Sequence, residues 1–551
     1  MIDKIGSVKN NSYTPNRNLK NQNKNQPSFQ GLGEMFISLV QKCEQQPMVN
    51  VSVLDLSTAI IPRTAIETVA GSKKKDENGN EKRELNVYAG MEAFRRESSG
   101  LIVNCLIPSF IVMGAASLLQ KPIMNGFGKA NLANLWANEE SLKTVNKYLI
   151  KAEGTGAKRL ESALHSFMND LSGIDGELEK GFVDTAGKEN IQEGIKNLVE
   201  SADESKNSKI LFKKGYKQIA DASLMTENLK LKGQSGYLAK NLEEYFEDFV
   251  KVHKAFEKEG ITTAEQANRF ISKAVKLVNA KSIAGLALII PLAISMQPLN
   301  RWLTRKSSGK KGAPIYNDFA DRKEDKEMSP KEKKELITQK FISIGSMISA
   351  AGLSMFMDRP VWKNIFQFKG LFPTMDQARI ISTATFASRM ASAEDKNELR
   401  ESTIRDIATF SSFYFLGDYV AKGIATILEK RNPDIKLINT LQKRKENANI
   451  LQKMWHWAKH TTIKSSEELA TTKAKNLRTI CQCGNILFSL LSLGVFIPLY
   501  TRAKTNKKHA EELAKQKNDL INSKADVATK SDSFTKKIIK DNTIAFKNFI
   551  N

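Results

Sequence analysis

Long apolar stretches without a charged residue constrain the fold of this chain most strongly. Residues 98–120 and 479–501 each form a run of 23 uncharged residues. Residues 282–300 form a run of 19, and residues 341–357 form a run of 17. As helices, these runs would measure roughly 26 to 34 Å, against a hydrocarbon core about 30 Å thick. We therefore expect about four transmembrane helices.

Proline favours lipid over a soluble core as the surroundings of these runs. Pro108, Pro291 and Pro498 each lie inside one of them. In the interior of a soluble helix, each proline would cost about 3 kcal/mol. Membrane helices tolerate proline when neighbouring helices satisfy the freed carbonyl groups. The alternative is a set of buried helices in a soluble protein, where 23 residues without a charge would be unusual.

Charge and hydropathy limit how much of the chain lies in a membrane. The 551 residues carry a formal net charge of +24, 26% of them are charged, and the mean hydropathy is −0.37. These values exclude a transporter built almost wholly from membrane helices, but they permit a few spans separated by large soluble segments. The basic excess favours anionic partners, either phospholipid headgroups or nucleic acid.

The sequence pattern predicts an all-α multi-span membrane protein with a helical soluble domain. A capping box at Thr262–Glu265 and apolar residues at helical spacing support the helical reading of the soluble part. The predicted units are a disordered polar N-terminal segment 1–33, a first membrane-associated unit 34–120 with its span at 98–120, a helical soluble domain 121–281, a transmembrane helix 282–300, a basic linker and helix start 301–340, a second membrane-associated unit 341–428, a basic amphipathic helical segment 429–478, a transmembrane helix 479–501 and a basic helical tail 502–551.

A fifth apolar stretch, residues 407–428, contains two charged residues. Asp418 and Lys422 stand four positions apart, so on a helix their side chains could form an ion pair. Inside a bilayer this stretch would need that pair or a polar cavity, because unpaired charges are costly there. The alternative is an amphipathic helix with an exposed corner, and the sequence favours it slightly.

Short motifs recur in the same order in the two parts of the chain and suggest a tandem repeat. Each match alone could be chance, so their common order is the evidence. The halves would be residues 30–305 and 335–508, arranged as parallel repeats with a long insertion in the first. The matched motifs are 36–39 with 341–344, 61–64 with 372–374, Arg96-Glu97-Ser98-Ser99 with Arg400-Glu401-Ser402-Thr403, and 290–292 with 497–499.

Basic clusters predict the orientation of the spans. Both Ile-Pro-Leu helices end in arginine and lysine, which the positive-inside rule places in the cytoplasm. The domain 121–281 would then lie outside, but the basic segment 429–478 would lie outside too, and no assignment satisfies every loop. The residues expected to contact lipid headgroups are Arg301, Arg305, Lys306, Arg502, Lys504, Lys507, Lys536, Lys537 and Lys540.

Two basic amphipathic segments flank the last apolar run. Residues 435–458 and 534–550 each align apolar side chains on one helical face with lysine or arginine opposite. Such a helix can lie among lipid headgroups or pack within its own protein. His456 and His460 have a spacing seen in metal sites, but no third ligand is evident, and the neighbouring Trp455 and Trp457 favour an interfacial belt.

The sequence contains no signature of a known reaction. It has neither a phosphate-binding loop nor a hydrolase or metalloprotease motif, so we predict no catalytic, cofactor or metal residues and favour a non-enzymatic protein. The leading hypothesis is a membrane scaffold that holds anionic lipid through basic helices and protein partners through 121–281. The alternatives are a solute transporter or channel built from two repeats, with Asp418 and Lys422 in its path, and a peripheral nucleic-acid-binding helical protein, which the lack of a known module disfavours. We expect a membrane location, the inner membrane in a bacterium, and find no cleaved signal peptide in the first thirty residues.

Overall fold

The computed structural model describes residues 47–69, 73–75, 81–83, 85–172, 185–203, 207–234, 236–308, 328–358, 365–445, 447–500, 503, 504, 507 and 511. The predicted disordered segment 1–33, the amphipathic helix 534–550 and the residues Arg502, Lys536, Lys537 and Lys540 lie outside this set. Helices dominate the described residues, and the prediction of an all-α chain is confirmed.

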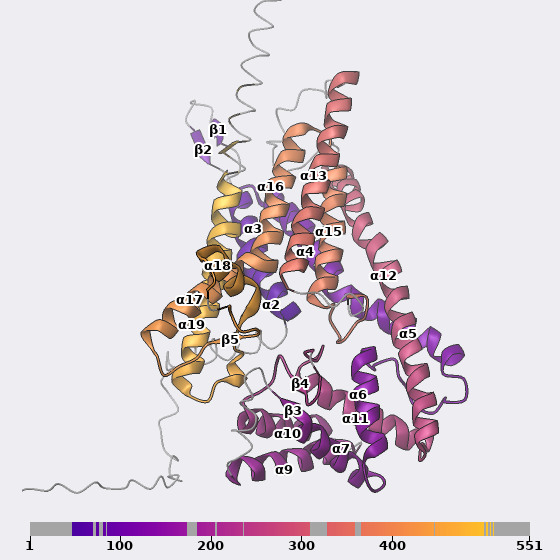
Figure 1. Ribbon diagram of the computed structural model, residues 1–551. Coiled ribbons are helices and arrows are strands. Elements are labelled where there is room, and N and C mark those ends of the chain that lie inside the picture. The colour runs from indigo at the N-terminus through magenta and orange to yellow at the C-terminus, as the bar shows by residue number, and fades with distance from the viewer. Residues whose placement is uncertain are drawn as a thin grey trace, which may run out of the picture.

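An upper bundle contains all the long apolar helices (Figure 1). Four π-helical turns, labelled η, interrupt its helices without breaking them. The helix around Pro108 therefore runs unbroken from Val87 to Ile123. The bundle elements are α2 (Pro47–Leu54), η1 (Asp55–Ile60), α3 (Ile61–Val69), α4 (Val87–Leu101), η2 (Ile102–Leu106), α5 (Ile107–Ile123), α13 (Pro330–Met357), α15 (Met375–Ala391), α16 (Lys396–Ser411), η4 (Ser412–Leu416), α17 (Gly417–Arg431), α19 (Thr472–Ser489) and η6 (Leu490–Phe496).

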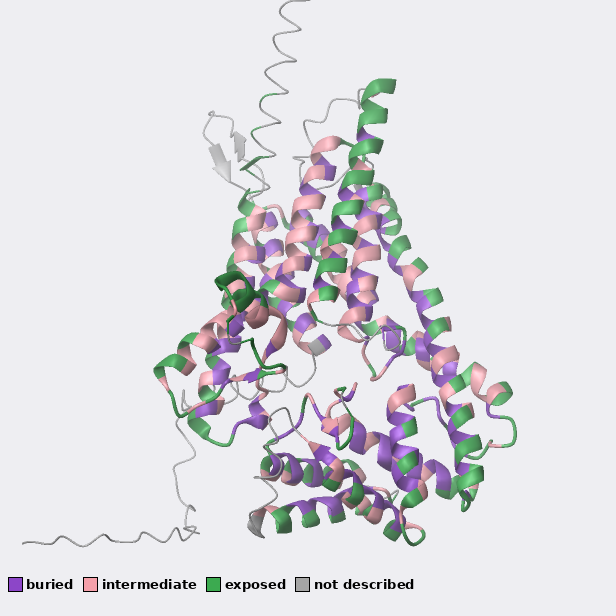
Figure 2. Ribbon diagram, in the orientation of Figure 1, coloured by how far each residue is buried: buried purple, intermediate pink, exposed green. Residues whose placement is uncertain are grey.

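A helical domain lies at the lower end of the bundle, as expected for residues 121–281 (Figure 1). Its core is aromatic: the ring of Phe167 lies 5.4 Å from that of Tyr245 and 5.1 Å from that of Phe249. Figure 2 shows how densely buried residues fill this domain. Its helices are α6 (Glu139–Lys151), α7 (Ala157–Asp170), α9 (Thr185–Glu200), α10 (Ser208–Ser223) and α11 (Leu242–Glu259).

One 45-residue helix, α12 (Ala264–Ser308), joins the domain to the bundle. At 1.5 Å per residue it is roughly 67 Å long. Phe270, Ala274 and Leu277 in its first part are buried in the domain core, whereas Ile289 and Ala293 are buried in the bundle. The predicted boundary at residue 281 therefore falls inside a continuous helix.

Short strand pairs occupy the loops among the described residues. All are antiparallel: β1 (Lys73–Lys75) with β2 (Glu81–Arg83), β3 (Leu171–Ser172) with β4 (Lys230–Leu231), and β5 (Ile438–Thr440) with β6 (Thr461–Ile463). The last pair corrects the helix predicted over 435–458. Only α18 (Ile450–His460) is helical there, because Asn449 caps its first turn while residues 438–440 pair with β6.

Two kinds of contact hold the bundle together. Within each part of the chain, α5 packs against α12 and α17 packs against α19. In addition, α12 contacts α15, whereas η6 contacts η1 and α3. Gly494 lets η6 approach η1 closely, since a Cβ atom at this position would lie 2.6 Å from the carbonyl oxygen of Thr58. In Figure 1, α12 rises along the right of the bundle and α19 along its left.

Four of the described helices are long and apolar enough to cross a membrane. They are Val87–Ile123, Ala264–Ser307, Pro330–Met357 and Thr472–Tyr500, and they contain the four runs identified from the sequence as far as the structure describes them, which is to Tyr500 in the last run. Ser329 and Glu332 form the capping box at the start of α13. Residues 407–428 are not among the four; they are divided between α16, η4 and α17.

The helical domain touches the segment before α19, which contains the 3-10 turn η5 (Ser466–Glu468). The hydroxyl of Tyr216 donates a hydrogen bond to the Glu467 carboxylate. The backbone N–H of Glu227 donates to Oε1 of Glu468 over 3.1 Å. Burial, helped by the charges of Glu247 and Glu467, raises the pKa of Glu243 at this contact to about 7. Several carboxylates therefore share one interface.

This contact is expected to weaken as the pH rises. Because the pKa of Glu243 is raised from 4.5 to about 7 in the folded chain, the folded form holds a proton over that window that the unfolded form has lost. Stability at the contact is therefore complete at lower pH and declines between about pH 4.5 and 7. Hydrogen exchange at residues 225–231, corrected for intrinsic rates, should accelerate across this window. A Glu243→Gln variant should show no such acceleration; an unchanged pH profile in that variant would disprove the assignment to Glu243.

Candidate functional site

A cavity of about 90 Å³ lies inside the upper bundle. Its wall is built from α2–η1–α3, α4–η2, α15, α16–η4 and the end of the α19–η6 helix, so residues from both parts of the chain meet there. Every one of the four π-helical turns that the structure describes contributes to this wall. Such turns are frequent at functional sites because they displace side chains from the regular helical register.

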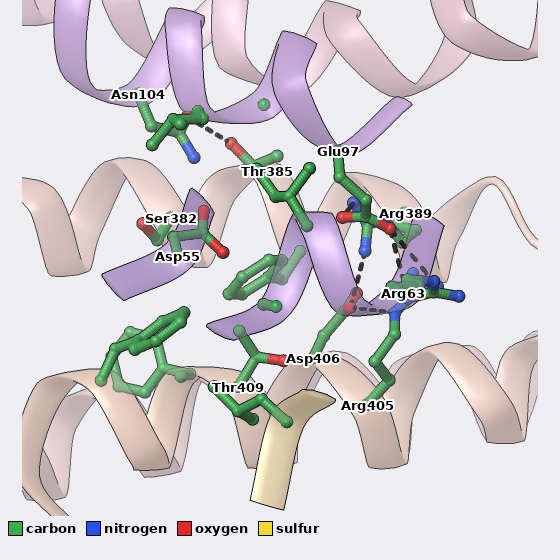
Figure 3. A pocket seen from close by; sticks show the side chains of 18 of the residues that line it. Asp55, Arg63, Glu97, Asn104, Ser382, Thr385, Arg389, Arg405, Asp406 and Thr409 are labelled. Carbon is green, nitrogen blue, oxygen red and sulfur yellow. Dashed lines mark hydrogen bonds and ion pairs between the residues drawn. The ribbon is translucent and has the colours of Figure 1, made fainter. Parts of the chain in front are cut away.

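A partly buried carboxylate, Glu97 on α4, organises one side of the cavity (Figure 3). Its oxygens lie 3.3 Å from Arg63, 3.5 Å from Arg389 and 3.8 Å from Arg405. The three arginines come from α3, α15 and α16 respectively. Glu97 thus joins α3 to the consecutive helices α15 and α16, which come much later in the chain.

Two further carboxylates complete this ion-pair cluster. Asp406 accepts a hydrogen bond from Arg389 over 2.8 Å and one from Arg405 over 3.0 Å. Glu401 lies 4.0 Å from Arg63. The Asp406 side chain is only 1% exposed, and its Oδ2 atom has no hydrogen-bond partner among the described residues. The cluster is therefore buried and incompletely paired, an arrangement that proteins keep mainly where it serves a function.

The other side of the cavity combines a carboxylate with hydroxyl groups and rings. Asp55, at the start of η1, makes no hydrogen bond or ion pair to any described residue. The hydroxyl groups of Ser382 and Tyr414 lie 2.8 Å apart. Thr385 donates to the Asn104 side chain over 3.0 Å. In Figure 3, Asp55 and Ser382 lie on the opposite side of the view from Arg63 and Arg405.

Two of the motifs that suggested a tandem repeat contain residues of this ion-pair cluster. Arg96–Ser99 and Arg400–Thr403 were matched as repeat anchors, and their glutamates are the cluster residues Glu97 and Glu401. A second match, Ser57-Thr58-Ala59 with Ser382-Thr383-Ala384, was missed. Each copy precedes a cluster arginine, Arg63 or Arg389, by a few residues. The repeated motifs with their charged residues were therefore the sequence signal that could have located this cluster.

The predicted pair Asp418 and Lys422 lies outside this cavity. Asp418 is exposed, whereas Lys422 is buried. The Lys422 Nζ atom donates hydrogen bonds to the carbonyl oxygens of Trp457, Ala458 and Thr461 over 2.9 to 3.1 Å. No ion pair between Asp418 and Lys422 occurs among the described contacts. Lys422 anchors the end of α18 to α17.

The predicted lipid contacts that the structure describes differ in their surroundings. Arg301 forms ion pairs with Glu394 and Glu398 and is only partly exposed. Arg305 and Lys306 are exposed at the end of α12, with the Lys306 ammonium 5.3 Å from the Trp302 ring. The side chains of Lys504 and Lys507 are exposed as well. Contact between any of these residues and lipid stays a prediction.

Comparison with known proteins gives no relative from which a function could be transferred. No protein family, curated protein or solved structure matches the chain.

Proposed function

We propose that this chain is a multi-span membrane protein whose two halves form a parallel tandem repeat, and that it moves a small polar solute through the cavity between them. The observation that carries the proposal is the cavity itself. It contains buried arginine and carboxylate side chains, it collects all four described π-turns, and it lies among apolar helices of membrane-spanning length. Charged residues in such surroundings are costly and mark solute or ion pathways.

The exposed surface of the apolar helices supports membrane insertion. In α13 only 17% of the most apolar window is buried within the protein, and the values for the other three helices are 39%, 44% and 33%. Phe341 and Ile342 on α13 are 73% and 63% exposed. Soluble monomers rarely expose apolar patches of this extent, whereas lipid would cover them.

The order and packing of elements support the repeat. In each half a shorter helix, α2–η1–α3 or α15, precedes a helix with a π-turn, α4–η2–α5 or α16–η4–α17. An insertion and a return helix, α12 or α19–η6, follow. The contacts are reciprocal, because each return helix packs on the shorter helix of the other half, α12 on α15 and η6 on η1 and α3.

The ion pairs of the cavity are reciprocal between the two halves as well. We place Arg63 opposite Arg389, which replaces the predicted match of 61–64 with 372–374, and Glu97 opposite Glu401. The ion pair Arg63–Glu401 is then matched by the ion pair Arg389–Glu97. The distances are 4.0 and 3.5 Å. Two equivalent pairs that cross between the halves are what a two-fold relation through the cavity produces. Asp406 breaks this symmetry, since Ile102 stands at the matching position.

The helix directions support a topology that avoids the conflict among the loops described above. The start of α13 lies beside the end of α15, where Lys340 donates to the Ala391 carbonyl over 2.8 Å. The chain therefore descends through α13, returns through α15 and descends again through α16 and α17. In this arrangement both insertions, 124–263 and 432–471, lie at one end of the bundle, and the basic end of α12 lies at the other.

Flux through reconstituted protein tests the proposal. Liposomes containing the chain should release at least one class of isotope-labelled small solute, whether cation, anion or zwitterion, faster than empty liposomes. Ser382→Trp fills the cavity and should lower that flux at least tenfold. The control is Ser349→Trp on the exposed face of α13. Equal flux through the two variants, or none above empty liposomes, would contradict transport; comparing both by gel filtration identifies a folding defect.

One observation favours the scaffold hypothesis as a second candidate. α18 buries none of its residues, and Ile450, Leu451 and Met454 are 62 to 75% exposed. With Lys453 and Lys459 on the same short helix, this surface suits the headgroup layer of an anionic membrane.

A lipid-binding role for α18 predicts a composition-dependent effect. In nanodiscs, Trp455 fluorescence should shift to shorter wavelength when anionic lipid replaces zwitterionic lipid, because α18 would move into the headgroup layer. The chain has 5 tryptophans, so the signal of Trp455 is obtained by comparing the fluorescence change with that of a Trp455→Phe variant. Identical spectra in the two lipids would remove this candidate.

A further inference from the structure

We propose that the cavity is a binding site for a small organic ammonium ion, with Asp55 as its counter-ion and the rings of Phe410 and Tyr414 among its walls. The inference rests on the proposed function, because it assigns a substrate class to the same cavity.

The charge balance of the cavity favours a cation. Its lining contains three guanidinium groups and five carboxylates, Asp55, Glu67, Glu97, Glu401 and Asp406. Arg96 lies close enough to Glu97 to act on its charge, and with it the carboxylates still exceed the guanidinium groups by one. A carboxylate that faces a cavity without a cationic partner is costly, so a bound cation would stabilise Asp55.

Asp55 lies apart from the arginine side chains of the cavity (Figure 3). The arginines are engaged by Glu97, Glu401 and Asp406 on one side of the cavity. Asp55 has no hydrogen-bond or ion-pair partner among the described residues. The buried Oδ2 atom of Asp406 is a second acceptor without a described partner. Both acceptors belong to residues that line the same space.

Aromatic walls decide which kind of cation fits. Phe386, Phe410, Phe413 and Tyr414 all line the cavity, and the rings of Phe410 and Tyr414 are 4.7 Å apart. The face of an aromatic ring attracts a diffuse ammonium charge, and a quaternary or alkylated ammonium also gains apolar contact. A hard metal ion needs several oxygen ligands instead, and no group of three or more metal-binding side chains occurs among the described residues.

The size of the cavity limits the ligand to a few heavy atoms. A water molecule needs roughly 10–15 Å³ of such volume, so about 90 Å³ accommodates a handful of atoms. Methylammonium and tetramethylammonium fall in this range. A larger ligand would require the helices around the π-turns to move apart.

Equilibrium binding to the full chain in nanodiscs tests the site without requiring transport. Titration calorimetry with methylammonium and tetramethylammonium chloride should give saturable binding, with sodium chloride at equal ionic strength as the reference. Asp55→Asn should weaken binding at least tenfold, because it removes the counter-ion while keeping the side-chain shape. Asp55→Glu should retain part of the affinity. Asp418→Asn is the matched control, since Asp418 is an exposed carboxylate on the same bundle that does not line the cavity.

The outcomes separate this site from the transport proposal. Binding that is lost in Asp55→Asn and kept in Asp418→Asn establishes the site, whether or not the same ion crosses liposomes. Absence of binding to the native chain, equal affinity in Asp55→Asn, or equal binding of sodium would overturn it. Flux of other solutes would still be measured independently, so a failed ammonium site leaves the transport test intact.

Discussion

Replacing Arg389 with alanine is expected to lower the free energy of unfolding by about 3–5 kcal/mol. Arg389 is 7% exposed, and its guanidinium group pairs with Glu97 over 3.5 Å and with Asp406 over 2.8 Å. Removing it would leave the buried Asp406 and the partly buried Glu97 with fewer partners. Most of the expected loss comes from this uncompensated charge and not from the net strength of the pairs.

Chemical unfolding of the purified chain in detergent micelles measures the effect of Arg389→Ala. The control is Lys396→Ala, which breaks an ion pair with Glu335 whose side chains are 39% and 48% exposed. That change should cost less than about 1 kcal/mol, because water screens an exposed pair. Similar losses in both variants would show that the cluster around Glu97 does not stabilise the bundle.

Replacing Lys240 with methionine is expected to destabilise the helical domain by a comparable amount, about 3–5 kcal/mol. The Lys240 Nζ atom donates to Asp248 over 2.7 Å and to the Trp136 carbonyl over 2.8 Å, and both charged side chains are 2% exposed. Burial already raises the pKa of Asp248. Without Lys240 the pKa should rise further, so the loss should be smaller at pH 5 than at pH 8.

Hydrogen exchange localises the effect of Lys240→Met. Amides of α6 and α11, the helices around the pair, should exchange much faster in the variant, while amides of α19 should change little. Lys251→Met is the matched control on α11, because Lys251 pairs with Glu247 at the surface, with side chains 37% and 45% exposed. Unaltered protection of α6 in Lys240→Met would contradict the assigned role.

Local signals predicted the helices well. The runs 98–120, 282–300 and 341–357, and the described part of the run 479–501, lie inside continuous helices, because a long apolar segment in lipid satisfies its own backbone only as a helix. Ser329 and Glu332 marked the start of α13 for the same local reason, a capping box. These features depend on residues within a few positions of one another.

Features that depend on distant contacts could not be read in the same way. Residues 435–458 have helical periodicity, but Ile438–Thr440 pairs with Thr461–Ile463, and that pairing prevails over the local preference. The spacing predicted an ion pair between Lys422 and Asp418, whereas three backbone carbonyl oxygens from residues 457–461 accept the hydrogen bonds of Lys422. The cavity joins residues up to several hundred positions apart, as with Asp55 and Leu493, so no local pattern describes it.

Membrane topology tests the central claim most directly. The four native cysteines are first replaced with alanine, and a single cysteine is then placed at Glu200, Ile450 or Lys331. After the membranes are washed with carbonate, each variant is treated with an impermeant thiol reagent. Glu200 and Ile450 belong to the two insertions, and Lys331 lies at the opposite end of the bundle. The account predicts that the chain stays in the pellet, with positions 200 and 450 labelled from one side and position 331 from the other. A chain that washes off, or labelling of all three positions from one side, would contradict it.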